Sequence, residues 1–212
     1  MKMLDLFSGL GGASEAMIQD PKWEVQRIEN NVLLESVPNT TLKSVFELRD
    51  ELVKMEREGY SPATTIDLVW ASPPCVEFSL AYSSPQSIAL REGKQYQPDL
   101  RAVEATIEII RILKPRYWVI ENVRGAVNWF KPLLGKQAKV INHSIFMWGN
   151  FPAFVNPKID SKEKGAGSSS DPLRANKRAI IPFAVSQELK NAIENQKQIW
   201  DYVPLGHGEV YR

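Results

Sequence analysis

The chain has 212 residues, of which 43% are hydrophobic and 24% are charged. These values are ordinary for a globular protein, and the length allows a sizeable core without disulfides or a structural metal. Lysine and arginine (26) nearly balance aspartate and glutamate (25), so any polyanion site must be a local basic patch. The composition therefore predicts a single domain spanning residues 1–212.

The sequence lacks the signatures of secreted and membrane proteins. Its one cysteine, Cys75, excludes an internal disulfide and suits a reducing compartment. The apolar part of the N-terminus is too short for a signal peptide, and no apolar run approaches the roughly 20 residues that span a bilayer. The two histidines and the cysteine show no metal-ligand spacing. We therefore expect a cytoplasmic protein with no membrane partner and no metal.

The N-terminal stretch has the order of a strand, a glycine turn and a helix. Residues 3–7 predict the strand, residues 8–12 (Ser-Gly-Leu-Gly-Gly) the turn and residues 13–18 the helix. Glycines let a ligand approach the backbone, and a helix N-terminus offers unpaired N–H groups. The pattern fits a mononucleotide-type cofactor site and equally a structural turn, and its spacing departs from the G-x-G-x-x-G of dinucleotide sites.

Residues 23–28 predict a second strand, which ends at Glu29. An acid at this position can accept hydrogen bonds from both ribose hydroxyls of a nucleoside; the alternative is a solvated surface glutamate. Residues 44–58 predict a short strand or turn that leads into an amphipathic helix. Either Glu47 or Asp50 in this segment is a candidate contact for the base of the same nucleoside.

A buried strand leads to the only cysteine. Residues 66–71 (Ile-Asp-Leu-Val-Trp-Ala) predict a buried parallel strand, and the two prolines that follow end it. Cys75 therefore follows the carboxyl end of a strand, where open α/β sheets place their ligand crevice. A lone cysteine is more often a small buried hydrophobe, but Glu77 and Ser79 make its surroundings polar. Cys75 is thus a candidate nucleophile.

The segments after the cysteine complete the predicted sheet. Residues 81–98 are rich in Ser, Gln, Pro and Gly, which predicts a loop that closes over substrate, with disorder as the alternative. Residues 100–113 predict a core helix and residues 116–120 a strand. That strand brings Glu121 to the same rim of the sheet as Cys75; the alternative is a capping or surface role for Glu121.

The C-terminal third mixes strands with a basic segment. Residues 139–141 and 144–148 predict two more strands, and residues 181–193 a final helix. Between them, residues 157–178 carry six lysines and arginines around a Gly/Ser run. We expect a flexible basic loop there, which is a candidate for phosphate contacts or else a solvated surface.

Three blocks in a fixed order resemble motifs I, IV and VI of the DNA cytosine-5 methyltransferases. They are residues 5–12 (DLFSGLGG), residues 73–79 (PPCVEFS) and residues 121–123 (ENV). Residues 148–152 (WGNFP) and 178–183 (RAIIPF) are similar to the compact phage-type members of that family. Such members belong to prokaryotic or phage-infected cells, in restriction–modification or phage protection.

The resemblance implies an α/β class I S-adenosylmethionine-dependent methyltransferase fold, Rossmann-like, with a mostly parallel sheet and helices on both faces. It implies S-adenosylmethionine as cofactor and DNA, as a duplex with a flipped cytosine, as partner. It assigns Cys75 as nucleophile and Glu121 as its catalytic partner. Its candidate cofactor contacts, to which we add Asp50, are Phe7, Gly9, Leu10, Gly12, Glu29 and Pro73. The candidate substrate contacts are Ser79, Asn122, Arg124 and Arg178.

The implied chemistry begins with a thiolate that adds to C6 of cytosine and makes C5 nucleophilic toward the methyl group. Glu121, protonated or sharing a proton, would hydrogen-bond N3 of the ring. A base must then remove the C5 proton, and the sequence does not name it.

The chain also departs from the family pattern. The Gln-x-Arg-x-Arg block is not found before Ser144, and Lys139 or His143 is the candidate replacement. The long target-recognition region of full-size members is absent, so residues 157–178, a partner or a second subunit would supply recognition. The alternatives are methylation of cytosine in RNA or a nucleotide, or a catalytically silent DNA-binding or regulatory homologue.

Overall fold

The computed structural model describes residues 1–60, 65–135, 139–141, 144–159 and 170–196. Its centre is a seven-stranded sheet in the order β3-β2-β1-β4-β5-β7-β6. The strands are β1 (Lys2–Leu6), β2 (Glu24–Glu29), β3 (Thr40–Leu42), β4 (Leu68–Ala71), β5 (Tyr117–Asn122), β6 (Lys139–Ile141) and β7 (Ile145–Asn150). The first five pair in parallel, and β7 runs antiparallel to both of its neighbours. The expected mostly parallel α/β sheet is confirmed.

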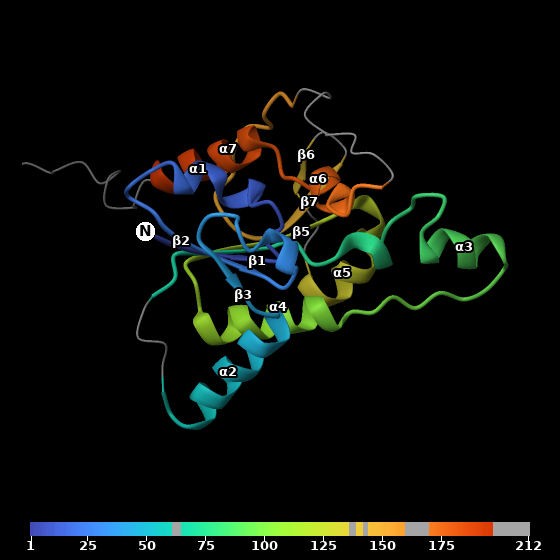
Figure 1. The fold of residues 1–212 in the computed structure, drawn as a ribbon, viewed down its shortest axis with the longest axis horizontal. Helices are drawn as coiled ribbons and strands as arrows, with labels where there is room; N and C mark the ends of the chain where they lie inside the picture. The colour runs from blue at the N-terminus through green and yellow to red at the C-terminus, as the bar shows by residue number, and fades with distance from the viewer. Residues whose placement is uncertain (61–64, 136–138, 142–143, 160–169, 197–212) are drawn as a thin grey trace, which may run out of the picture.

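Helices cover both faces of the sheet (Figure 1). On one face lie α1 (Glu15–Ile18) and α7 (Phe183–Glu194), and on the other lie α2 (Val45–Arg57), α4 (Arg101–Leu113) and α5 (Val127–Leu134). The shorter helices are α3 (Pro85–Arg91) and α6 (Arg174–Arg178), with 3₁₀ turns η1 (Gly12–Ser14), η2 (Val32–Leu34), η3 (Cys75–Glu77) and η4 (Arg124–Ala126). No helix in the described part of the chain is long and apolar enough to cross a membrane.

The strand before the cysteine shows why its sequence is apolar throughout. Successive side chains of a strand point to opposite faces. Leu68 and Trp70 accordingly pack in the core under α1 and α7, while Val69 and Ala71 pack in the core under α2 and α4. A strand that is covered on both faces needs apolar residues at every position, as β4 has.

Four elements differ from the expectations or were not foreseen. Within the expected loop of residues 81–98, Pro85 occupies the first turn of α3 and Ser84 caps it, accepting a hydrogen bond from the backbone N–H of Ser87 (3.3 Å). The strand β3 is only three residues long, and α5 contains Pro132, so neither has a strong periodic pattern. The short helix α6 lies in residues 157–178, for which the sequence predicts a flexible basic loop.

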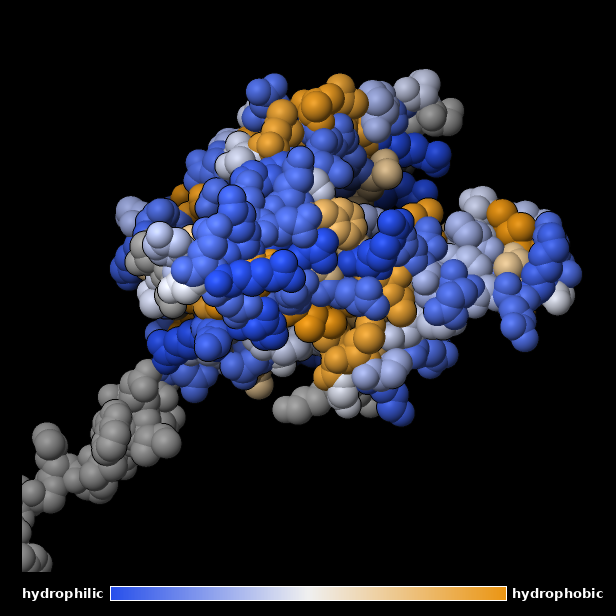
Figure 2. Space-filling model, turned by 90° about the horizontal axis from the view of Figure 1, so that it is seen from below, coloured by the Kyte–Doolittle hydropathy of each residue, from blue (hydrophilic) through white to orange (hydrophobic). Residues whose placement is uncertain are grey.

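The segment around α3 forms an arm beside the body of the protein. It lies at the far right of both views, away from the sheet (Figures 1 and 2). No residue of α3 is buried, and Leu80, Tyr82 and Leu90 on the arm are more than half exposed. The arm starts directly after η3, which contains Cys75.

Candidate active site

A cavity of about 470 Å³ opens at the carboxyl ends of β1, β2, β4 and β5. Its volume lies within the usual range for small-molecule sites, and its position is the one expected for open α/β sheets. The predicted site residues that line it are Phe7, Gly9, Leu10, Gly12, Glu29, Pro73, Cys75 and Glu121. The structure therefore brings the cofactor candidates and the catalytic candidates together around one space.

The glycine turn after β1 forms one wall of the cavity. The backbone of Gly9 has φ of 55°, in the left-handed region, and its N–H donates to Oε2 of Glu29 at 2.8 Å. Gly12 packs against the segment before α7, because a Cβ on Gly12 would lie 2.4 Å from the carbonyl oxygen of Ile181. Both glycines thus permit close approaches that a side chain would prevent.

Glu29 is 8% exposed and is not a solvated surface residue. Its Oε1 accepts the backbone N–H groups of Asn30 and Asn31, both at 2.9 Å, in addition to the bond from Gly9 to Oε2. A carboxylate offers about four acceptor positions. The carboxylate is therefore fixed in orientation and retains acceptor capacity for a ligand hydroxyl.

Two further polar residues of the cavity were not predicted. Asp5, in β1, is buried, and this burial raises the pKa of its carboxyl to about 6. Oγ of Ser8 is buried and has no hydrogen-bond partner among the described residues. A buried hydroxyl without a partner is costly unless a ligand satisfies it. Both residues belong to the block of residues 5–12, in which the glycines carry the stronger sequence pattern.

Cys75 and Glu121 come from neighbouring strands. β4 and β5 pair in parallel with Ala71 opposite Ile120. Glu121, the next residue of β5, and the segment after β4 that contains Cys75 therefore lie at the same edge of the sheet. Cys75 begins η3 and is exposed at the cavity. Desolvation raises the pKa of its thiol, and the negative charge of Glu121 raises it further, whereas the charge of Arg178 lowers it. The cysteine thus requires assistance to become a thiolate at neutral pH.

Asn122 is buried beneath the cysteine segment and does not line the cavity. Its Nδ2 donates to the carbonyl oxygen of Pro73 (2.9 Å), and its Oδ1 accepts the N–H of Val123 (2.9 Å). Nearby, a Cβ on Gly125 would lie 1.8 Å from the carbonyl oxygen of Phe78. The turn after β5 therefore packs tightly against the segment that contains Cys75.

The remaining substrate candidates, Ser79, Arg124 and Arg178, are not among the residues that line the cavity. Ser79 is half-buried, and its Oγ accepts the N–H of Ala81 at 3.2 Å. Arg124 is exposed at the start of η4, directly after β5. Arg178 is exposed on α6; Ala175 and Asn176 of this helix, and Ala179 directly after it, line the cavity. Ala175, Asn176 and Ala179 form no recognisable motif, so the sequence did not predict that they line the cavity.

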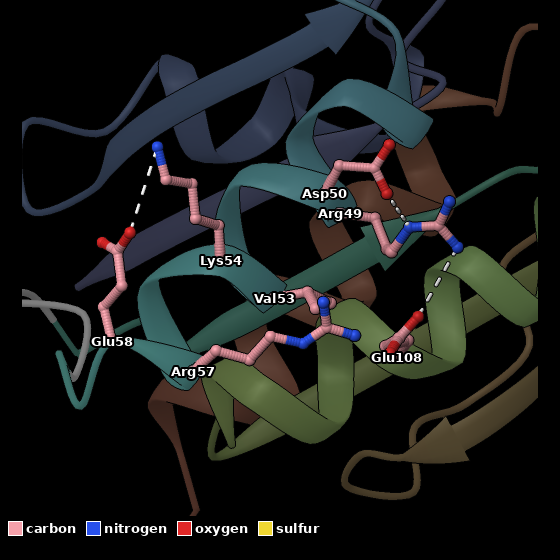
Figure 3. Close-up of a pocket in the computed structure, with 7 residues that line it drawn as sticks. All are labelled: Arg49, Asp50, Val53, Lys54, Arg57, Glu58 and Glu108. Carbon is pink, nitrogen blue, oxygen red and sulfur yellow. Dashed lines mark hydrogen bonds and ion pairs between the residues drawn. The ribbon is translucent and has the colours of Figure 1, made fainter.

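The structure does not bring Asp50 to the other cofactor candidates. It is exposed on α2 and lines a separate surface cavity between α2 and α4, where it accepts a hydrogen bond from Arg49 at 2.6 Å (Figure 3). The reason is the start of α2: Ser44 caps it and Glu47 closes a capping box. Residues 43–46 consequently line the active-site cavity, and Asp50 lies further along the helix, facing solvent.

Lys139 does not reach the cavity either. Its ammonium group donates to the carbonyl oxygen of Phe154 and lies 4.0 Å from the centre of the Phe154 ring. Desolvation there lowers the pKa of Lys139. His143, the other candidate for the missing basic block, lies outside the described residues.

Comparison with known proteins assigns this site to a family. A family model described as C-5 cytosine-specific DNA methylase matches residues 1–145. The chain belongs to this family, and its α/β sheet is the fold expected for S-adenosylmethionine-dependent methyltransferases.

Individual relatives are similar over part of their length. The chain is 29% identical over 146 residues to the type II methyltransferase M.AquIA of Picosynechococcus sp., covering 61% of this chain and 51% of the relative. It is 28% identical over 127 residues to the "Probable DNA (cytosine-5)-methyltransferase" of Frog virus 3, covering 58% and 53%. It is 24% identical over 151 residues to the DNA (cytosine-5)-methyltransferase PliMCI of Paracentrotus lividus, covering 65% and 9%. The chain thus spans about half the length of the first two.

A solved structure described as a DNA modification methyltransferase encoded within a prophage (E. coli) superposes with a TM-score of 0.44 at 17% identity. The superposition covers 71% of this chain and 46% of the other.

Proposed function

We propose that the protein transfers a methyl group from S-adenosylmethionine to C5 of cytosine in DNA. The observation that carries the proposal is the shared cavity: Cys75 and Glu121 line the same space as the glycine turn and Glu29. A nucleoside-containing methyl donor and a pyrimidine ring would therefore lie next to each other, beside a sulfur nucleophile and an acid.

The residues present fit the donor. Glu29 is oriented by three backbone N–H groups and can accept from a ribose hydroxyl, and the unpartnered hydroxyl of Ser8 can satisfy a polar group of the ligand. Phe7, Phe46 and Pro73 supply apolar walls. When bound, S-adenosylmethionine supplies an electrophilic methyl group.

Cys75 and Glu121 act on the cytosine. The thiolate of Cys75 forms a bond to C6, and the electron pair of the C5–C6 double bond makes C5 nucleophilic. Glu121, in its protonated form, donates a hydrogen bond to N3 and stabilises the charge that develops on the ring. After C5 has gained the methyl group, a base takes the C5 proton, and the sulfur leaves C6 with its electron pair.

Exposed groups around the cavity supply contacts to nucleic acid. A stacked base cannot reach Cys75, so the target cytosine must leave the helix. Arg124 and Arg178 are exposed, in η4 and α6, and can contact phosphates. Glu77 fixes the base of the arm by accepting from the hydroxyl of Tyr96 at 2.8 Å, which supports the arm as the segment that closes over DNA.

The same proposal extends to the organisation of the protein. Residues 1–212 act as one catalytic domain, in the cytoplasm of a prokaryotic or infected cell. Target recognition comes from residues 157–178, of which 160–169 lie outside the described residues, or from a partner or second copy.

A trapping experiment tests the function. Duplex DNA that contains 5-fluorocytosine cannot lose the C5 substituent as a proton, so a thioether between the enzyme and C6 persists and migrates as a complex in a denaturing gel. We expect this complex with wild-type protein and S-adenosylmethionine, and none with Cys75→Ala. DNA from cells that express the wild-type protein should show protected cytosines in bisulfite sequencing.

Other outcomes would redirect the proposal. Transfer of labelled methyl to RNA or to a cytidine nucleotide, with none to DNA, would assign a different substrate. Binding of DNA without transfer to any of these acceptors would make the protein a silent homologue and refute the proposal.

A further inference from the structure

A buried arginine that does not line the cavity supports the glycine turn. Arg27 lies in β2 and is 1% exposed. Its guanidinium donates to the carbonyl oxygen of Gly11 (2.7 Å), to Oγ of Ser14 (2.8 Å) and to the carbonyl oxygen of Pro38 (3.1 Å). It also contacts the carboxylate of Glu15 at 3.2 Å. One side chain therefore links the turn, η1, α1 and the segment before β3.

The backbone of the turn needs such support. Phe7 has φ of 56°, a left-handed conformation that is costly for a residue other than glycine and persists where the surroundings over-determine it. Gly9 and Gly11, with φ of 55° and 81°, adopt this region without strain but have many alternative conformations that the surroundings must exclude. Gly11 packs directly on the guanidinium, because a Cβ at this position would lie 2.2 Å from Cζ of Arg27. The same strand holds the other half of the turn, through the bond from Gly9 to Glu29.

The charge of Arg27 is balanced by an acid on the cavity wall. Oγ of Ser14 accepts from Arg27 and donates to Oδ2 of Asp5 at 2.6 Å. Asp5 lines the cavity. Burial raises the pKa of Asp5, whereas the bond from Ser14 and the charge of Arg27 lower it. A continuous network thus connects the buried cation to the space that receives the ligand.

We propose that Arg27 is a positioning residue for the cofactor: it keeps residues 8–12 in the conformation that accepts S-adenosylmethionine. The inference rests on the proposed function and extends it, because Arg27 does not line the cavity and lies outside the three sequence blocks of the family. If the turn adopts its accepting conformation for only part of the time, the apparent dissociation constant rises by the inverse of that fraction.

The test measures the dissociation constant of S-adenosylmethionine by titration calorimetry, without nucleic acid, and the unfolding temperature in parallel. Arg27→Met removes all four contacts, and we expect binding to weaken about tenfold as the competent fraction falls to about one tenth. Arg27→Lys keeps the charge but not the planar fork, so it should restore part of the affinity. With unmethylated DNA as the methyl acceptor, the KM for the cofactor should rise while kcat changes little.

Lys190→Met is the matched control. Lys190 is another largely buried cation, paired with Asp20 at 2.7 Å and with Glu194 at 3.3 Å. Asp20 follows the end of α1 that is remote from η1. This variant should lower the unfolding temperature and leave the affinity for S-adenosylmethionine unchanged.

The outcomes separate the two proposals. If folded Arg27→Met binds S-adenosylmethionine as tightly as the wild type, the positioning role is wrong. If the wild type itself does not bind S-adenosylmethionine, the proposed function fails instead. Should Arg27→Met not fold, Ser14→Ala removes only the hydroxyl that joins Arg27 to Asp5; it should weaken binding severalfold, and unchanged affinity would overturn the inference.

Discussion

The side-chain amide of Asn122 donates a hydrogen bond of 2.9 Å to the carbonyl oxygen of Pro73, two residues before Cys75. The bond is buried and joins the end of β5 to the segment that follows β4. It therefore links the two strand ends that carry the sulfur and Glu121. Asn122, which the sequence predicts to contact substrate, bonds the backbone of the cysteine segment, and we expect it to position that segment.

Asn122→Ala should consequently impair turnover more than cofactor binding. Loss of a buried hydrogen bond that leaves a carbonyl unsatisfied costs about 1–3 kcal/mol of stability, and the cysteine segment gains freedom. We expect a lower kcat for methyl transfer and an unchanged dissociation constant for S-adenosylmethionine. Asn150→Ala is the control, since the Asn150 amide also bonds a backbone carbonyl, that of Arg116 (3.0 Å), but is exposed. Equal kcat values for the two variants would contradict the positioning role of Asn122.

The reactivity of Cys75 should respond oppositely to its two charged neighbours. Glu121 raises the pKa of the Cys75 thiol and Arg178 lowers it. In the absence of cofactor, Glu121→Gln should therefore accelerate alkylation by iodoacetamide at pH 8, and Arg178→Gln should slow it. The rate follows the thiolate fraction, which falls as the pKa rises.

Arg174→Gln provides the control for this measurement, because Arg174 is exposed on the same short helix as Arg178 and is not among the groups that shift the Cys75 pKa. Its alkylation rate should equal that of the wild type. Acceleration in Arg178→Gln would show that the arginine does not act on the thiol.

The pH dependence of the protein's stability should reveal the raised pKa of Asp5. Burial raises the pKa of its carboxyl from 3.8 to about 6. Between these values the folded protein holds a proton that the unfolded chain has released, so the contribution of Asp5 to stability declines as pH rises through this window. Asp5→Asn cannot ionise. The free energy of unfolding of Asp5→Asn minus that of the wild type should therefore increase as pH rises, by up to about 3 kcal/mol between pH 4 and pH 7.

Asp20→Asn should show the opposite dependence in the same denaturant titrations. The hydrogen bond from Lys190 lowers the pKa of Asp20, so the stabilising contribution of Asp20 is present at neutral pH and is lost as pH falls. The variant should be less stable than the wild type at pH 7, and the difference should shrink on acidification. A pH-independent difference between Asp5→Asn and wild type would contradict the buried, raised carboxyl.

The sequence predicted best where the chain itself carries a strong physical constraint. An apolar run with no polar position requires burial on both faces, and two prolines must end it, so β4 and the location of Cys75 were readable. The glycines and Glu29 follow strands whose parallel pairing brings their carboxyl ends to one edge. To predict that these residues meet, it was enough to know which strands are neighbours in the sheet.

Prediction failed where tertiary context decides. Asp50 and residues 44–46 belong to the same predicted segment, residues 44–58, and only the capping bonds of Ser44 and Glu47 settle which of them face the cavity. The cavity wall formed by α6 and the residue after it consists of Ala175, Asn176 and Ala179, which form no sequence pattern that indicates a ligand site. Arg27 reads as an ordinary strand residue until the turn above it is seen.

The contact between Gly12 and Ile181 has a consequence for synthesis. The family's sequence match ends at residue 145, yet the cavity also includes residues 175–181, and Oγ of Ser186 in α7 donates to the carbonyl oxygen of Ala13. A nascent chain emerging from the ribosome would thus carry all three diagnostic blocks before it had a complete receptacle for the methyl donor. We therefore expect binding of the donor to require residues 175–186, which pack onto the turn after β1.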